Sequence, residues 1–505
     1  MKKVAIMLML LTIFSKILGL TRDITLSYFY GASGISDAYL ISLTIPGTIF
    51  AFIGTGIATT FIPLYSNIEN TVNTKSADRF TNNILNLTLV ICSCLIVCGA
   101  LFTNEIVGIF ASGFEEETLK LAVTFTRISL FGIYFSGLVF IFTSYLRMKN
   151  KFVIPALIGV PLNLFTIISI AASSKYSLLL LAAGSIIATA SQLLLLIPSA
   201  YKSGFRYNPI LEISDKNVKR MMFLSMPVIL GTSVNEINKL IDRSMASQIA
   251  VGGISALNYA HKIDGFIQGI FVMSIVTVMY PMIAKMAAEN NISGLKKTLS
   301  ESISGINLLL VPATIGVMVF AEPIVLLLFG RGAFDEEAVS MTSNALFYYA
   351  FGLMGFGLRE VLNRVFFSLQ DTKTPMINAV ISMVINIILI YILSKYFGIG
   401  GLALATSISA IVCTLLLFVN LRKKIGSYGL RSIIVSFGKM VLASLLMVFI
   451  AKGIFNFIIR DINSDVSLMI SISIGALVYI IIIYYMKIEG VDSLINNIWR
   501  KLIKK

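Results

Sequence analysis

Charged residues are scarce in this chain of 505 residues: Asp, Glu, Lys and Arg make up 13% of it, whereas hydrophobic residues make up 57%. Soluble globular domains carry roughly 25% charged residues, so this balance is typical of a protein embedded in lipid. Polar linkers and low-complexity tracts are also missing. Because long soluble chains divide into domains joined by polar linkers, the composition excludes a large soluble protein and predicts a membrane protein.

Residues that hold metals or perform catalysis are equally few. The chain has one histidine and four cysteines, and Cys92, Cys94, Cys98 and Cys413 lie in apolar runs without a histidine or carboxylate beside them. We interpret them as apolar packing residues. Phosphate-binding Gly-x-x-x-x-Gly-Lys loops, paired-histidine motifs and Asp-rich Mg²⁺ clusters do not occur. The sequence therefore predicts a protein that is not an enzyme and binds no metal or cofactor, and it leaves a coupled Na⁺ or H⁺ open.

The net charge of +15 comes mainly from basic residues in short loops between apolar runs. This distribution indicates membrane topology, not a nucleic-acid surface. One set of alternating loops, together with both termini, is basic, while the other set carries acidic runs at 115–117 and 335–337. Because cytoplasmic loops are enriched in Lys and Arg, we predict a multi-pass protein of the cytoplasmic (inner) membrane with both termini in the cytoplasm.

Apolar runs long enough to span a bilayer recur along the whole chain. A spanning helix needs about 20 largely apolar residues, and a helix satisfies its own backbone hydrogen bonds in lipid. The fold class is therefore predicted to be an all-α polytopic membrane protein with about fourteen spans. They lie near 4–24, 37–64, 81–110, 119–146, 152–173, 177–200, 220–247, 254–286, 298–328, 340–369, 374–395, 400–421, 433–458 and 466–487.

The first twelve spans contain an internal repeat. Residues 34–39 (GISDAY) resemble residues 253–259 (GISALNY), and two pairs of prolines recur in matching spans at the same offset of about 220 residues, Pro63 with Pro281 and Pro155 with Pro375. A six-span unit repeated in the same direction predicts two lobes related by a pseudo-two-fold axis along the membrane normal, with a substrate site between them. The predicted regions are an N-terminal lobe (1–200), a cytoplasmic linker (201–219), a C-terminal lobe (220–424), and two extra spans with a basic tail (425–505).

Several predicted spans contain charges, although each costs about 2.5–3.5 kcal/mol at the centre of an inserting helix. They concentrate in the first, seventh, eighth and tenth spans, which we therefore predict to line a water-filled cavity. Cations outnumber acids there, and a cationic cavity favours an anionic substrate such as a lipid-linked pyrophosphate. The candidate substrate-binding residues are Lys16, Arg22, Asp23, Asp37, Lys239, Arg243, Lys262, Arg359 and Arg364.

Structural roles are open for some of these charges. Glu360 and Arg364 are spaced i, i+4 and can neutralise each other within one helix. Lys239 and Arg243 share a helix face with Glu236 and can form an internal network. Lys16 is the hardest to explain structurally, because it lies in the middle of an apolar span.

Three stretches resemble the MurJ (MviN) family of lipid II flippases, within the multidrug, oligosaccharide-lipid and polysaccharide exporter superfamily. The opening Ser15-Lys16-x-x-Gly19-x-x-Arg22-Asp23 followed by Ser36-Asp37-Ala38 resembles the first helices of the family. Residues 258–262 (NYAHK) resemble its eighth-helix motif, and residues 364–375 its tenth-to-eleventh-helix junction.

The resemblance implies flipping of lipid II, the undecaprenyl-pyrophosphate-linked peptidoglycan precursor, to the outer leaflet by alternating access. It also implies a groove for the polyprenyl tail at the last two helices, a role in peptidoglycan biosynthesis and cell shape, and the cell-wall synthesis machinery as partner. Lys16, Arg22 and Lys262 match the family's cavity cations, and Asp23 and Asp37 its acidic positions. Lysine replaces the family's arginine at 16 and 262, which keeps the charge but loses bidentate phosphate geometry.

Three rival functions remain at this point: two other kinds of exporter and a membrane enzyme. An exporter of another polyprenyl-linked polysaccharide unit would also need a cationic cavity, whereas a cation-coupled drug exporter would favour an apolar cavity with a buried acid. A membrane enzyme acting on polyprenyl phosphates would need clustered carboxylates or histidines, which the sequence lacks.

Overall fold

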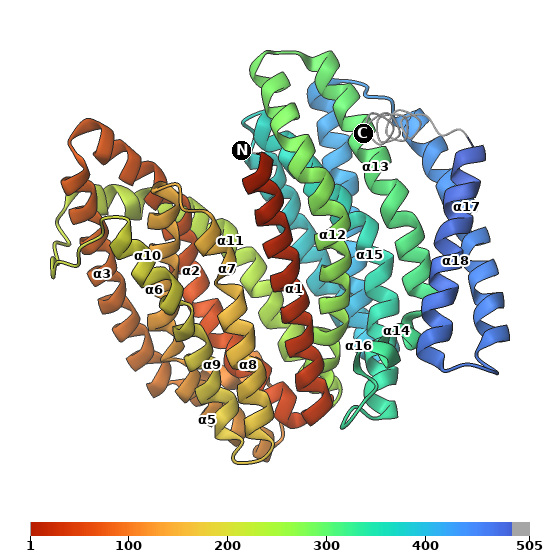
Figure 1. Ribbon diagram of the computed structural model, residues 1–505, viewed down its shortest axis with the longest axis horizontal. Coiled ribbons are helices and arrows are strands. Elements are labelled where there is room, and N and C mark those ends of the chain that lie inside the picture. The colour runs from red at the N-terminus through yellow and green to blue at the C-terminus, as the bar shows by residue number, and fades with distance from the viewer. Residues whose placement is uncertain (1, 487–505) are drawn as a thin grey trace. The chain divides into compact units, whose positions relative to one another are not determined.

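The computed structural model describes residues 2–486, and in this range the chain is helical, with no β-strand (Figure 1). The predicted basic tail falls on residues 487–505, outside the described residues. Two compact units are present. Unit 1 comprises the described residues up to Ser255 together with Arg331–Asp335, and unit 2 comprises the other described residues.

Unit 1 is built from eleven helices and the first residues of a twelfth. They are α1 (Lys2–Tyr30), α2 (Gly34–Thr71), α3 (Thr74–Leu101), α4 (Thr103–Phe110), α5 (Glu116–Ser129), α6 (Gly132–Met148), α7 (Val153–Leu157), α8 (Gly159–Ser173), α9 (Leu179–Ser191), α10 (Leu193–Lys202) and α11 (Lys216–Ile249).

Unit 2 contains the remaining helices. They are α12 (Gly253–Ala288), α13 (Ile292–Val319), α14 (Ala321–Phe329), α15 (Glu336–Ser368), α16 (Lys373–Ile425), α17 (Leu430–Ile458) and α18 (Ser464–Tyr485). Non-helical backbone at Gly398, with φ 54° and ψ −131°, breaks α16. The break separates the two spans predicted at 374–395 and 400–421.

The all-α membrane fold is confirmed, and the predicted spans all fall on helices, alone or in consecutive pairs. Nine helical stretches of the described residues are long and apolar enough to cross a membrane, and two of them are the consecutive pairs α7 with α8 and α9 with α10. The number is ten if α5 and α6, bent by 43°, form a single span. This number counts α16 once, although two spans are predicted within it. Helices α11 and α15 are not in this group, because polar and charged residues interrupt their apolar stretches. The exact count of fourteen stays a prediction.

Each unit buries its own apolar core and exposes apolar residues on its surface. In unit 1, Phe61, Tyr65 and Tyr145 are fully buried between α2, α3 and α6. In unit 2, α12, α13, α15 and α16 enclose a second core, and α17 and α18 pack against α13. Phe449 and Phe457 on α17 are 80% and 72% exposed, as expected for side chains that face lipid tails.

The predicted linker is fixed to unit 1. Its non-helical part runs from residue 203 to 215, between α10 and α11. The side-chain amide of Asn82 donates to the carbonyl of Arg206 and its oxygen accepts from the backbone N–H of Asn208, both at 2.9 Å. Asn83 pairs in the same way with both backbone groups of Glu212 at 2.7 and 2.9 Å. Asparagine side chains on α3 therefore replace the backbone partners that an extended segment would otherwise lack.

The internal repeat coincides with helix starts, since α2 begins at Gly34 and α12 at Gly253. Pro63 lies inside α2 and Pro281 inside α12, as the matching offsets predict. The two compact units do not coincide with the predicted lobes. Helix α11 belongs to the predicted C-terminal lobe, but it packs along α2 and is therefore part of unit 1. The boundary of the predicted lobes at 219/220 and their pseudo-symmetry stay predictions.

Candidate substrate site

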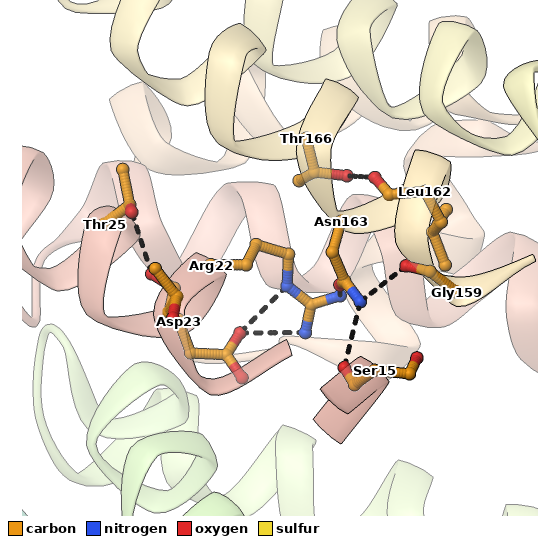
Figure 2. Close-up of polar contacts among 9 residues, drawn as sticks. Ser15, Arg22, Asp23, Thr25, Gly159, Leu162, Asn163 and Thr166 are labelled. Atoms are coloured by element: carbon orange, nitrogen blue, oxygen red, sulfur yellow. Dashed lines mark hydrogen bonds and ion pairs between the residues drawn. The ribbon is translucent and has the colours of Figure 1, made fainter. Parts of the chain in front are cut away.

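The Arg22 guanidinium in α1 is held between two helices of unit 1 (Figure 2). Its Nε and Nη2 donate to Oδ1 of Asp23 at 3.2 and 2.9 Å, and its Nη1 donates to Oδ1 of Asn163 in α8 at 3.4 Å. The Arg22 side chain is 26% exposed, and that of Asp23 is 5% exposed. A buried carboxylate beside an arginine is stabilised by the pair, because neither charge is then left alone in a medium of low dielectric constant.

Asn163 connects α1 to α8. Its Nδ2 donates to the carbonyl of Ser15 at 3.3 Å and to that of Gly159, one turn earlier in α8, at 2.8 Å. Ser15 and Arg22 are two turns apart on α1, so the same face of α1 meets Asn163 at both places. One buried amide therefore sets the rotation of α1 and the position of the guanidinium.

Lys16 lies beside this face and is half-buried. Among the described residues it forms no ion pair and no side-chain hydrogen bond. Its ammonium therefore keeps its donors for another group, which agrees with the predicted substrate role without testing it.

Asp37 has a structural contact of its own. Its Oδ1 accepts from the backbone N–H and from the hydroxyl of Ser255, both at 2.7 Å. Ser255 lies in the first turn of α12, where N–H groups have no partner within the helix. Asp37 thus caps α12, and its predicted contact with substrate would have to use its other oxygen.

Part of the internal network that the structural alternative expected on α11 is present, since Glu236 pairs with Lys239. Glu236 is buried and accepts from Thr48 of α2 at 2.9 Å and from Lys239 at 2.8 Å. Arg243 donates to the carbonyl of Ile254 at 3.1 Å. Lys239 is 60% exposed despite its pairing with Glu236, so its ammonium remains accessible.

In unit 2, the eighth-helix motif lies in the first half of α12. Lys262 is half-buried, and the ring of His261 is 5.6 Å from that of Tyr349. Asp264, buried two residues later, accepts from Gln268 at 2.6 Å. A cation, an imidazole and a buried carboxylate therefore lie within one turn of α12, the carboxylate two residues beyond the motif.

Both arginines predicted on α15 contact aromatic rings in unit 2. Arg364 donates twice to Glu360, at 3.0 and 2.7 Å, and its guanidinium lies 5.5 Å from the ring of Tyr280. Arg359 lies 5.1 Å from the ring of Phe356. The i, i+4 pair that the sequence offered as an alternative for Arg364 is present, and a role of either arginine in substrate binding stays a prediction.

Sequence reasoning missed the neutral polar partners of these charges. Asn163 bonds Arg22 and Ser255 bonds Asp37, while Thr48 and Gln268 bond the neighbouring acids Glu236 and Asp264. None of the four was predicted as a partner. A lone amide such as Asn163 in an otherwise apolar span was an available signal, because polar groups inside membranes are costly unless partnered.

Comparison with known proteins identifies the family of this chain. The family model described as lipid II flippase MurJ matches residues 26–472. A probable lipid II flippase MurJ of Buchnera aphidicola subsp. Baizongia pistaciae is 32% identical, with 83% of each chain covered. A solved lipid II flippase MurJ in an inward closed conformation superposes with a TM-score of 0.82 at 29% identity, covering 95% of this chain and 99% of the other.

A more distant likeness concerns the fold alone. A multidrug resistance MATE family transporter of the MOP superfamily, solved in an inward-facing conformation, has a TM-score of 0.71 at 15% identity. It covers 82% of this chain and 95% of that one. The family match, by contrast, extends over most of the chain and includes the helices that carry Asp37, Lys262 and Arg364. This chain belongs to the MurJ family of lipid II flippases, a family of multi-pass membrane transporters.

Proposed function

We propose that this chain flips lipid II from the cytoplasmic to the outer leaflet of the cell membrane by alternating access. Membership of the flippase family supports the substrate. The structural observation that carries the proposal is the Arg22 guanidinium, partly exposed yet fixed inside an apolar bundle by Asp23 and Asn163. A partly exposed guanidinium in a bundle of this kind can bind an anionic group in addition to Asp23.

Arg22 retains hydrogen-bonding capacity for that partner. A guanidinium has five N–H donors, and the contacts to Asp23 and Asn163 use Nε and a single N–H on each terminal nitrogen. The second N–H of each terminal nitrogen is left for pyrophosphate oxygens, which suit the planar fork of arginine. Asp23 balances the charge when the site is empty, and the fixed geometry lowers the entropy cost of binding.

Lys16 in unit 1 and Lys262 in unit 2 are proposed as further cations that contact the pyrophosphate during transport. A lysine ammonium is a point charge on a flexible stem, so it follows a moving phosphate more easily than a rigid guanidinium does. Lys239, Arg243, Arg359 and Arg364 are proposed as further contributors, although each has a protein partner or a ring contact of its own.

The loop charges support a location in the cytoplasmic membrane with both termini inside. Cysteine labelling from outside should therefore modify a cysteine placed at position 116 and leave one at position 203 unmodified; the opposite pattern would reverse the topology. The cell-wall synthesis machinery is the partner we propose on the outer side, because it consumes the flipped precursor.

We propose that the membrane potential, without a nucleotide or other cofactor, drives the cycle. An elementary charge crossing 100 mV gains about 2.3 kcal/mol, so outward movement of a pyrophosphate from an inside-negative cytoplasm is favoured. Return of an emptied cationic site is favoured for the same reason. Flipping in proteoliposomes at imposed potentials of either sign, with pH and sodium fixed, tests this. Equal rates at both polarities would instead point to a coupled Na⁺ or H⁺, with Asn378, Asn386 or His261 as candidates.

The experiment that tests the function is depletion of the protein in growing cells. Lipid II should then accumulate in the cytoplasmic leaflet, and cells should lose their shape. A normal lipid II distribution together with a stalled surface polysaccharide would show that the chain exports another polyprenyl-linked unit.

A further inference from the structure

Unit 2 contains a cavity that the proposed transport does not use. Its volume is about 430 Å³, and it lies where α13 begins and where the chain turns from α16 into α17. The walls are formed by the first turns of α13 and by residues of the turn and of α17. Ligand pockets have volumes of roughly 300–1,000 Å³, so the cavity is large enough for a small headgroup.

The local sequence shapes this cavity. Lys297, Ser300 and Ser304 recur at helical spacing, so one face of α13 presents them together. The turn contains Gly426 and Gly429 at φ 79° and 83°, a left-handed conformation that residues with a Cβ rarely adopt. Tyr428 between them is 4% exposed and donates to the carbonyl of Phe418 at 3.1 Å. The tyrosine therefore fixes the turn, and the cavity is part of the packed structure.

The lining attracts anions. The lining contains two lysines, Lys296 and Lys297, and one carboxylate, Glu301. The ion pairs found in the described part of unit 2 use Lys285, Arg364 and Lys424 and leave both lining lysines out. Serine hydroxyls from α13, from the turn and from α17 add neutral donors on several sides. Ammonium and hydroxyl groups around one space are the donors that bind phosphate oxygens.

The surroundings favour a lipid phosphate over a free one. Ile434 and Val435, two and three residues after the lining residue Ser432 in α17, are 64% and 54% exposed. Exposed apolar residues therefore occur in the same turn of α17 as the cavity, and an acyl chain can pack against this part of the helix. Arg431, at the start of α17, is exposed beside the lining residue Ser432. Basic pockets between membrane helices near a charged surface are typical sites for anionic lipid headgroups.

We propose that this cavity binds the phosphodiester headgroup of an anionic membrane phospholipid, with Lys296 and Lys297 as its charged ligands. The bound lipid fastens the start of α17 to α13 and so stabilises the docking of the last two helices. The leaflet concerned is the inner one under the topology proposed above, but the binding itself does not depend on that topology or on the transported substrate.

The test is native mass spectrometry of the full-length protein, titrated with phosphatidylglycerol in a background of phosphatidylcholine. We expect saturable binding of phosphatidylglycerol and an affinity about tenfold lower in the double variant Lys296→Gln/Lys297→Gln, since each basic residue near an anionic headgroup contributes measurably. Ser304→Met should lower the affinity similarly by filling the cavity without changing its charge. Thermal unfolding of each variant shows whether it is folded.

The matched control is Lys285→Gln/Lys423→Gln, which removes two cations from the same end of unit 2 but outside the cavity. This variant should bind phosphatidylglycerol within about twofold of the unmodified protein. An equal loss of affinity in both double variants would show that surface charge alone causes the effect and would overturn the proposal. Unchanged binding in Lys296→Gln/Lys297→Gln would overturn it as well. Competition by inorganic phosphate at equal concentration would show that the occupant is a free anion and not a lipid.

Discussion

Two arginines show how differently the two units hold a charge inside an apolar bundle. Arg364 in unit 2 bonds Glu360, one turn away on the same helix. Arg22 in unit 1 bonds its neighbour Asp23 and also Asn163, which is 141 positions away in the sequence. The first arrangement is local and holds wherever the helix forms, whereas the second exists only when α1 and α8 pack together.

This difference between Arg22 and Arg364 indicates which arginine is positioned to bind a substrate group. A pair within one helix neutralises itself and needs no other element. A guanidinium fixed from a second helix has a defined direction, and its remaining donors point to a defined place. We therefore expect transport to depend more strongly on Arg22 than on Arg364.

The largest effect is expected for Arg22→Ala. Truncation leaves Asp23 as an uncompensated buried charge and removes the proposed pyrophosphate ligand. The loss of one partner of a buried, hydrogen-bonded charge pair costs about 2–5 kcal/mol, so flipping in proteoliposomes should fall by roughly 30-fold or more. Arg127→Ala, which removes an exposed arginine of α5, is the control and should stay within about twofold. Equal activity of both variants would contradict the assignment of Arg22.

Lys16 and Lys262 should come next. Lys16→Ala or Lys262→Ala is expected to lower flipping by about tenfold or more while the protein still inserts and folds, because each removes a cation from the substrate path. Lys→Arg at either position keeps the charge and should restore most of the activity. Normal growth of cells carrying either alanine variant at native expression would mean that the lysine concerned is structural.

A substitution of Asn163 tests the difference between the two arginines directly, because Asn163 is the residue of a second helix that bonds Arg22. Asn163→Ala removes the contact from α8 and should lower flipping by about three- to tenfold, because a typical intramolecular hydrogen bond contributes about 0.5–1.5 kcal/mol. The fall should appear mainly as weaker substrate binding, with the protein still folded. Asn163→Asp keeps an oxygen acceptor for Arg22 and should retain more activity than Asn163→Ala; the reverse order would assign Asn163 to helix packing alone.

The ion pair of Glu360 and Arg364 in unit 2 should neutralise itself and contribute little to substrate binding. Arg364→Gln alone leaves Glu360 without its partner, whereas Glu360→Gln/Arg364→Gln removes both charges. We expect the double variant to flip lipid II within about threefold of the unmodified protein and the single variant to be worse, since i, i+4 pairs contribute little on their own. A double variant as inactive as Arg22→Ala would show that Arg364 contributes to substrate binding as much as Arg22 does. The expected difference between Arg22 and Arg364 would then be wrong.

The smallest effect concerns an ion pair outside the spans. Lys424 bonds Asp371 in the loop before α16 at 2.6 Å, and this bond, together with hydrogen bonds from Thr374, lowers the pKa of Asp371 to about 2. The folded pKa lies below the unfolded one, so the pair stabilises the protein above about pH 4 and this contribution is lost as the pH falls toward 2. Lys424→Gln should therefore lower the thermal midpoint slightly at pH 7, by an amount equivalent to at most about 1 kcal/mol. The difference from the unmodified protein should shrink across that acidic range; a constant difference would exclude the ion pair as its cause.

The starts of the repeated helices could be read from the sequence because glycine and proline act locally. Gly34 and Gly253 begin α2 and α12, and Gly398 divides α16 between two predicted spans. Glu360 with Arg364 was available from spacing alone. The contact of Asp37 with Ser255 was not, because 218 positions separate the two residues and only the fold brings them together.

The sequence by itself determined that this chain is a helical membrane protein with rare charges confined to a few spans, because hydrophobicity and period act within each segment. Its motifs also determined the family. Only the tertiary structure decided which of those charges are bound by other residues: Asp37 caps α12, Glu236 holds Lys239 and Thr48, and Asn163 directs Arg22. Such partners are neutral or distant, and a hydrogen bond between two helices depends on how they pack, which no single segment specifies.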